Sequence, residues 1–219
     1  MSRNRIVLLC LALAPSGLTA EPRTLSVRVI DSLRNEPVAD ATVVINDGPA
    51  AAPSSFEMAQ KDRQFRPDSL VIARGSEVNF PNLDNTQHHV YSFAAAKTFE
   101  LELFSGQPDA PVVFEKAGVV EVGCNIHDRM QGFIIVTESS LTARTDDSGL
   151  ATVSLPSGSV LPNELSVSIW HPRLTDDNRT AHFTVSSLTS APAELALDLA
   201  PASRQNGRLD GLQKRFRDL

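Results

Sequence analysis

The most informative part of this chain is the segment Gly123-Cys124-Asn125-Ile126-His127-Asp128-Arg129-Met130-Gln131-Gly132. Apolar and β-branched residues stand on either side of it, over 119–122 and 133–136. Because short runs of this kind are typical of β-strands, we expect the segment to be a loop that joins two strands at one end of a sandwich. A loop of this length can present its Cys, His and Met side chains to a single point.

The same pattern of short strands continues through most of the chain. Runs that are apolar, or that alternate between apolar and polar residues, are each bounded by Gly, Pro, Asn or Asp, and no long stretch before the C-terminal tail has helical periodicity. This spacing predicts an all-β fold of the sandwich or barrel type. The expected strands lie at 25–30, 41–45, 69–73, 77–80, 89–93, 99–104, 112–114, 119–123, 133–136, 141–145, 150–155, 165–170, 182–185 and 195–199.

These strands divide between two predicted domains. The β-pattern over 23–48 is too short to fold alone and must pair with a later part of the chain, for which the β-unit beginning near Leu141 is the simplest partner. A stretch rich in Gly, Pro, Ala and Ser, over 48–55, separates this pattern from the next strands. We therefore predict a discontinuous β-sandwich over 21–50 and 138–200, with a second sandwich over 55–137 inserted between its parts.

The two ends of the chain differ from its body. Residues 1–20 have the features of an export signal: Arg3 and Arg5 precede an apolar stretch that is too short to span a bilayer, and Ala20 suits a cleavage site. We predict export and no membrane span. The tail over 201–219 has apolar residues at helical spacing among basic ones, which predicts a short helix that docks or frays, with a contact surface for an acidic partner as the alternative.

Cysteine content and charge narrow the class of protein. The 219-residue chain has two cysteines, and loss of the signal leaves only Cys124. A lone cysteine in an oxidising compartment has no intramolecular disulfide partner, so it is buried, paired between chains or bound to a ligand. Without Arg3 and Arg5, the 20 basic residues become 18 against 26 acidic residues, a formal charge of −8. This charge argues against a nucleic-acid partner.

Cys124, His127 and Met130 need one further ligand to complete a metal site. His88 and His89 stand at the start of a predicted strand, and strand alternation allows only one of them to face the loop. A thiolate, two imidazoles and a thioether favour copper, and a trigonal His₂Cys site with a weak axial Met is the arrangement of blue-copper electron-transfer sites. Zinc could use the same residues, but Met130 would then serve little purpose.

Each of these residues also has an ordinary structural interpretation. A lone cysteine beside a strand is usually a buried hydrophobic residue, and a methionine alone usually packs in the core. A His-His pair is usually a feature of a strand edge or surface. The spacing Cys-x₂-His-x₂-Met, together with an upstream histidine in an all-β frame, favours metal binding over these interpretations.

The chain from about 55 to 136 resembles the cupredoxins. The matching stretches include Phe65-x-Pro67, Gly75-x₂-Val78-x-Phe80-x-Asn82-x-Asp84, Gln87-His88-His89-Val90 and Cys124 to Gly132. The two-residue gap between His127 and Met130 is similar to that of amicyanins and shorter than that of plastocyanins. The resemblance implies a Greek-key β-sandwich that holds one type 1 copper in the bacterial periplasm.

The same resemblance implies a role for each ligand. Cys124 would be the thiolate ligand, His127 the second imidazole and Met130 the axial thioether. The family commonly has His-Asn-Val at the upstream position, where this chain has His88-His89-Val90. That alignment places His88 on the metal and His89 where an asparagine normally braces the loop, with His89 as the alternative ligand.

The chain as a whole is similar to methylamine-utilisation-like proteins, which combine a cupredoxin with a carboxypeptidase-regulatory-like β-sandwich of the immunoglobulin or prealbumin type. Pro37-Val38-x-Asp40-Ala41 and Thr145-Asp146-Asp147-Ser148-Gly149 are among the residues that carry this likeness. Trp170-His171-Pro172 lies in the same unit. We interpret it as a structural strand end, with a contact to a partner or a second metal as the alternative.

These observations lead to a predicted function and its alternatives. The prediction is a periplasmic one-electron carrier with redox donor and acceptor proteins as partners, and His127 would lie beneath an apolar docking patch. Copper storage or delivery is the alternative, although the Met- or His-rich tracts expected for it are lacking. A non-redox interaction module is a further alternative. We expect no enzymatic activity, because five histidines are too few for a multicopper centre and no other catalytic signature is evident.

Overall fold

A computed structural model of the protein describes residues 23–127, 129–156, 161–175, 179–187 and 191–201. Over these residues it contains 17 strands and no helix, so the prediction of an all-β fold is confirmed. The predicted signal over 1–20 and the predicted tail helix beyond Pro201 lie outside this part of the chain. Within it, no helix has the length and apolar character needed to cross a membrane.

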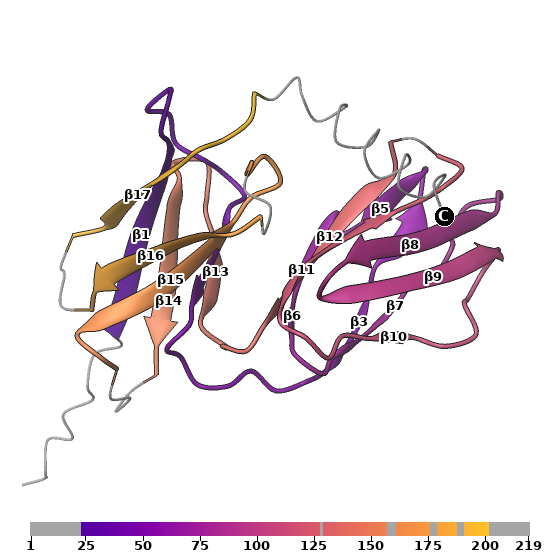
Figure 1. Ribbon diagram of the computed structural model, residues 1–219, viewed down its shortest axis with the longest axis horizontal. Coiled ribbons are helices and arrows are strands. Elements are labelled where there is room, and N and C mark those ends of the chain that lie inside the picture. The colour runs from indigo at the N-terminus through magenta and orange to yellow at the C-terminus, as the bar shows by residue number, and fades with distance from the viewer. Residues whose placement is uncertain (1–22, 128, 157–160, 176–178, 188–190, 202–219) are drawn as a thin grey trace, which may run out of the picture.

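One sandwich combines the beginning of the described chain with its later part (Figure 1). Its first sheet has the order β14–β1–β17, formed by Leu150–Leu155, Arg23–Asp31 and Ala193–Leu197. Its second sheet has the order β13–β2–β15–β16, formed by Thr142–Arg144, Thr42–Ile45, Glu164–Trp170 and Ala181–Ser186. Alternate residues along β1, such as Leu25, Val27 and Val29, face a single core between the two sheets. We refer to this unit as the first sandwich.

The residues between these segments form what we call the second sandwich, drawn on the right in Figure 1. Its main sheet has the order β6–β12–β11–β8–β9, formed by Ser69–Ala73, Gln131–Thr137, Gly118–Gly123, His88–Ala94 and Lys97–Phe104. Opposite it lies the sheet β10–β7–β3, formed by Val112–Val113, Glu77–Asn79 and Ser55–Glu57. A hairpin of β4 (Ala59–Lys61) and β5 (Gln64–Arg66) completes the unit.

The core of the second sandwich packs against the inner faces of β11 and β12. The inward side chains of Val120, Val122 and Ile134 are fully buried, and Phe80 and Phe114 pack in the same cluster. The two strands pair without interruption from Gly118–Val136 to Gly123–Gln131. The ends of the loop between them are therefore fixed by a continuous antiparallel ladder.

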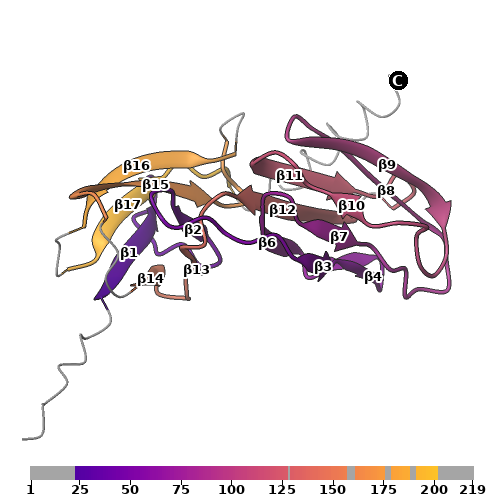
Figure 2. The same ribbon diagram turned by 90° about the horizontal axis from the view of Figure 1, so that it is seen from below.

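The outer faces of β11 and β12 contact the first sandwich, as Figure 2 shows where the ends of β15 and β12 approach each other. Phe133 and Ile135 form a small buried cluster with Trp170 at the end of β15, and the rings of Phe133 and Trp170 lie 5.0 Å apart. Because these strands are covered on both faces, polar side chains on the outer face must find partners there.

The observed strands differ from the predicted ones mainly over 55–66, where the sequence predicted none. In the β4–β5 hairpin, β5 has one buried residue, Phe65, between two exposed ones, and β4 has two consecutive buried residues followed by an exposed one, so neither strand shows a repeated alternation. At its turn, Asp62 and Arg63 both have φ near 57°. Strands this short leave too little periodicity to recognise. The predicted domain boundaries remain a prediction.

Candidate metal centre

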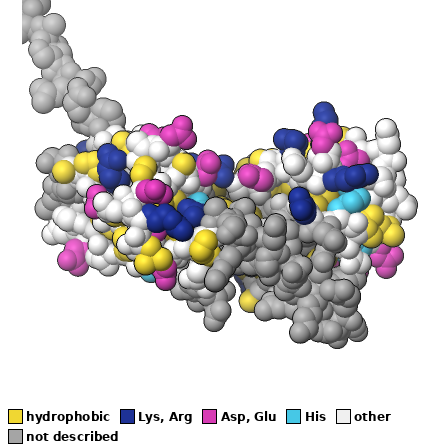
Figure 3. All heavy atoms as spheres, turned by 90° about the horizontal axis from the view of Figure 1, so that it is seen from above, with side chains coloured by type: hydrophobic (Ala, Val, Ile, Leu, Met, Phe, Trp, Pro, Cys, Tyr) yellow, Lys and Arg dark blue, Asp and Glu magenta, His cyan; other side chains and the backbone are white. Residues whose placement is uncertain are grey.

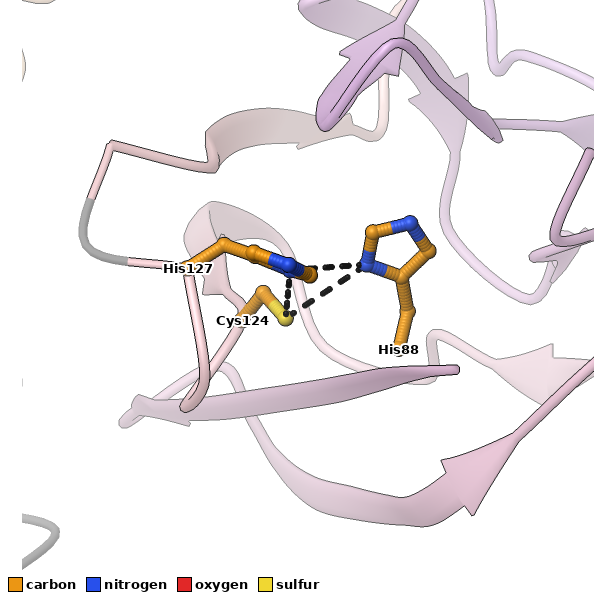
Figure 4. A group of neighbouring side chains, drawn as sticks. All are labelled: His88, Cys124 and His127. Atoms are coloured by element: carbon orange, nitrogen blue, oxygen red, sulfur yellow. Dashed lines mark hydrogen bonds between the residues drawn. The ribbon is translucent and has the colours of Figure 1, made fainter. Parts of the chain in front are cut away.

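Three of the four predicted ligands lie together at one end of the second sandwich. His88 is the first residue of β8, Cys124 directly follows β11, and His127 lies in the loop before β12 (Figure 4). Strand β8 is the neighbour of β11 in the sheet, with Tyr91 opposite Gly123. The fold thus brings a side chain from the start of one strand to the loop at the end of its neighbour.

The ligand atoms of this group face a common point. Cys124 Sγ lies 3.5 Å from His127 Nδ1 and 3.8 Å from His88 Nδ1, and the two Nδ1 atoms lie 3.1 Å apart. With metal–nitrogen bonds of about 2.0–2.1 Å and metal–sulfur bonds of about 2.3 Å, three ligands in a trigonal plane lie about 3.5–3.8 Å from one another. The observed separations fit that arrangement, with only the imidazole pair somewhat closer.

The group is shielded from water on most sides. Cys124 is 2% exposed and His88 is fully buried, whereas His127 is half-buried. Cys124 also belongs to the core cluster that contains Val122 and Ile134. An ion held here would therefore be enclosed by protein, with the His127 side of the site nearest to solvent.

Asp84 holds the His88 imidazole in the orientation that the site needs. Its Oδ2 lies 2.8 Å from His88 Nε2, so Nε2–H donates to the carboxylate and Nδ1 is left with its lone pair toward Cys124. The backbone N–H groups of Asp62 and Arg63 also donate to Asp84, at 2.8 and 3.0 Å. Burial acts to raise the pKa of Asp84, but these hydrogen bonds outweigh it and hold the pKa below its usual value.

His89 takes a different direction from its neighbour. Its Nε2 lies 2.8 Å from Glu100 Oε1 on β9, and its ring lies 5.6 Å from that of Tyr91. A register irregularity between His88 and Val90 marks this part of β8. Of the two histidines, His88 is the one that the structure brings to Cys124 and His127.

Met130 stands at the base of the ligand loop. Its N–H donates to the carbonyl of His127 at 3.0 Å, and its carbonyl accepts from the N–H of Cys124 at 3.2 Å. Its side chain is 1% exposed and lies in the same core cluster as Cys124. These backbone bonds close the loop between two of the predicted ligands, and the role of the Met130 thioether as a ligand stays a prediction.

Sequence reasoning missed the polar residues around the ligands. Asp84 lies in one of the stretches that carry the cupredoxin resemblance, but its contact with His88 was not foreseen. Glu121 on β11 is 7% exposed, and both Gln131 and Arg179 contact its carboxylate. Burial, then Glu121 and then Cys124 raise the pKa of the Tyr91 phenol, whose ring packs beside Gly123.

His171 lies in the first sandwich and has structural partners. It is 8% exposed, and its Nδ1 accepts the backbone N–H of Arg173 at 3.2 Å. Burial first, and then the charge of Arg173, lower the pKa of His171 to about 4, so the side chain is neutral at pH 7. In the described residues, the one group of at least three His, Cys, Asp or Glu ligands close enough to hold a metal is that of His88, Cys124 and His127.

A comparison with protein-family models finds no match for this chain, and neither does a comparison with curated proteins. Solved cupredoxins are its structural neighbours. A pseudoazurin from Sinorhizobium meliloti has 19% identity and a TM-score of 0.31, with 40% of this chain and 76% of the pseudoazurin covered. A purple cupredoxin from Nitrosopumilus maritimus has 21% identity and a TM-score of 0.33, with 38% and 99% covered.

An oxidised amicyanin mutant is similar to the same extent, with 18% identity, a TM-score of 0.35, and 44% of this chain and 98% of the amicyanin covered. The likeness to all three concerns less than half of this chain. The chemistry of the metal centre therefore rests on the residues of this chain alone.

Proposed function

We propose that this protein binds one type 1 copper ion and carries single electrons between redox partners. The observation that supports this most directly is the convergence of Cys124 Sγ with His88 Nδ1 and His127 Nδ1 at separations suited to a trigonal site. One thiolate and two imidazoles accept both oxidation states of copper, which would supply a one-electron couple when bound.

The surroundings of the ligands support electron transfer over catalysis or storage. The β11–β12 ladder and the Asp84 contact would hold one ligand geometry through each redox change. With Met130 as an axial ligand, no open position would remain for a substrate. For these reasons we propose a carrier and not an enzyme.

The surface near His127 suits contact with a partner protein. Ile126, the preceding residue in the ligand loop, is 47% exposed, and Leu83, beside Asp84, is 57% exposed. Figure 3 shows histidine and hydrophobic side chains close together at the right-hand end of the molecule. We propose that donor and acceptor proteins meet the site here and that the protein works in the bacterial periplasm, which the predicted export signal over 1–20 supports.

A copper titration tests this proposal. Cu²⁺ is added to the purified protein lacking residues 1–20, and the visible spectrum is recorded for the wild type and for Cys124→Ser. We expect an intense thiolate-to-copper band at one copper per chain that is absent from the variant. His88→Ala should abolish the band, whereas the matched variant His89→Ala should keep it. Colourless zinc binding in preference to copper, or an unchanged spectrum in Cys124→Ser, would overturn the proposal.

A further inference from the structure

The two strands that flank the ligand loop are contacted by a residue of the other sandwich. Arg179 lies between Trp170 and β16 in the first sandwich, yet its guanidinium forms an ion pair with Glu121 Oε2 on β11. Its Cζ also lies 5.6 Å from the centre of the Phe133 ring on β12. The side chains of Arg179 and Glu121 are only 20% and 8% exposed, so solvent screens this pair weakly.

Glu121 connects this contact to both arms of the ligand loop. It is the third residue before Cys124, and its second oxygen, Oε1, accepts a hydrogen bond from the side chain of Gln131. Gln131 directly follows Met130 and pairs with Gly123 in the ladder. The two strands that enter and leave the loop are thus tied together through a single carboxylate, and Arg179 neutralises its charge.

The backbone at Arg179 is itself in an unfavourable conformation. Its φ of 51° lies in the left-handed region, which residues other than glycine adopt at an energetic cost. A conformation of this kind persists where surrounding contacts hold it, and the contacts of Arg179 are those to Glu121 and Phe133. The arginine is therefore placed by its contacts with the second sandwich and not by local preference.

We propose that Arg179 is a positioning residue for the metal centre, through which the first sandwich fixes the base of the Cys124–Met130 loop and balances the charge of Glu121. This inference rests on the proposed copper function for its effect on redox chemistry. An uncompensated carboxylate near the site would favour Cu²⁺ over Cu⁺, so the presence of Arg179 raises the reduction potential. The first sandwich would then be part of the redox centre and not merely attached to it.

Arg144 provides a matched control because it also joins the two units. It lies on β13 of the first sandwich, and its guanidinium donates to Ser69 Oγ at the start of β6, a strand that β12 separates from β11 and Glu121. Arg144→Met removes an arginine contact between the sandwiches without touching the ligand loop. Arg179→Met removes the ion pair with Glu121, on the strand that enters the ligand loop.

Two measurements on the full mature protein test the proposal. The first is amide hydrogen exchange of the copper-free protein at Cys124 and Met130, whose N–H groups close the loop. Arg179→Met should accelerate exchange at both positions by at least about tenfold relative to the wild type, while Arg144→Met leaves them unchanged. Equal acceleration in the two variants, or none in either, would overturn the positioning role.

The second measurement is the reduction potential of the copper-loaded protein at pH 7. We expect a lower potential in Arg179→Met, a higher one in Glu121→Gln, and a value near the wild type in the double variant, because the two charges compensate each other. A potential that Arg179→Met leaves unchanged would overturn the electrostatic role. Should no variant and no wild type bind copper, the proposed function fails, and hydrogen exchange alone decides whether Arg179 positions the loop.

Discussion

Replacing Asp84 with asparagine should weaken copper binding without removing any proposed ligand. Asp84 accepts three hydrogen bonds, from His88 Nε2–H and from the N–H groups of Asp62 and Arg63. Asparagine keeps one acceptor oxygen but places its NH₂ group either against the N–H of Asp62 or against both the N–H of Arg63 and His88 Nε2–H. If the NH₂ group faces His88, the imidazole must move its proton to Nδ1, the atom that faces Cys124.

The expected magnitude depends on the kind of contact that is lost. Partners that orient a metal-ligating histidine typically contribute 10–100-fold to metal affinity, equal to about 1.4–2.8 kcal/mol. We therefore expect Asp84→Asn to raise the dissociation constant for copper by about tenfold or more. The copper-free protein should also lose roughly 2 kcal/mol of unfolding free energy, because charge-assisted bonds to the β4–β5 turn are weakened.

A chelator competition titration measures the first effect and denaturant unfolding the second. Asp62→Asn is the matched control: it lies on the same turn, is 71% exposed, and its side chain has a single 3.9 Å contact with Arg66. It should change neither quantity by more than about 0.5 kcal/mol. The reasoning is refuted if Asp84→Asn binds copper as tightly as Asp62→Asn does.

Three further substitutions have distinct expected outcomes. Met130→Leu should shift the visible spectrum and raise the reduction potential of the copper protein, because a weak axial thioether is lost. Met58→Leu, in the same buried core, should alter neither quantity. Equal effects of the two substitutions would count against an axial role for Met130. The pKa of His171 is about 4 in the folded protein and 6.5 in the unfolded chain. Between these pH values the unfolded state binds a proton that the folded state does not. The contribution to the unfolding free energy is therefore complete above pH 6.5 and falls by up to about 3 kcal/mol as the pH drops toward 4. His171→Asn should reduce this loss in denaturant unfolding at pH 7 and pH 4.5, and an unchanged pH dependence would contradict the assignment. Trp170→Ala should cost about 3–5 kcal/mol in the same assay, since it empties the cluster with Phe133; a loss below 1 kcal/mol would show that the sandwiches are not held together there.

The sequence predicted the parts of the metal centre that depend on local spacing. Cys124, His127 and Met130 occur within one loop between two strands with clear apolar patterns, and both the strands and the loop are present. The choice between His88 and His89 could not be made in this way, because strand alternation shows that only one can face the loop and does not show which one. Contacts with Asp84 and Glu100 distinguish the two in the structure.

Contacts between residues far apart in the chain left no trace in the sequence. Glu121 and Arg179 belong to different sandwiches, and the packing of Trp170 on Phe133 helps to bring the segments that carry them together. Each looks like an ordinary charged residue in its own stretch. Glu121 alternates with Val120 and Val122 as the outward position of a half-buried strand would, and the partner that covers that face could not be foreseen.

The hydrogen bonding among the ligands indicates what a metal ion would replace. Asp84 fixes a hydrogen on Nε2 of His88, so Nδ1 is an acceptor, and His127 Nδ1 and Cys124 Sγ lie 3.1 and 3.8 Å from it. A hydrogen on His127 Nδ1 or on Cys124 Sγ would lie in the space between these two atoms and His88 Nδ1, where a bound ion would lie. Because copper takes thiolate and neutral imidazole as ligands, Cys124, His88 and His127 would hold it with loss of that hydrogen as a proton. The β11–β12 ladder and the Asp84 contact would keep the shape of the site unchanged when a bound ion gains or loses an electron.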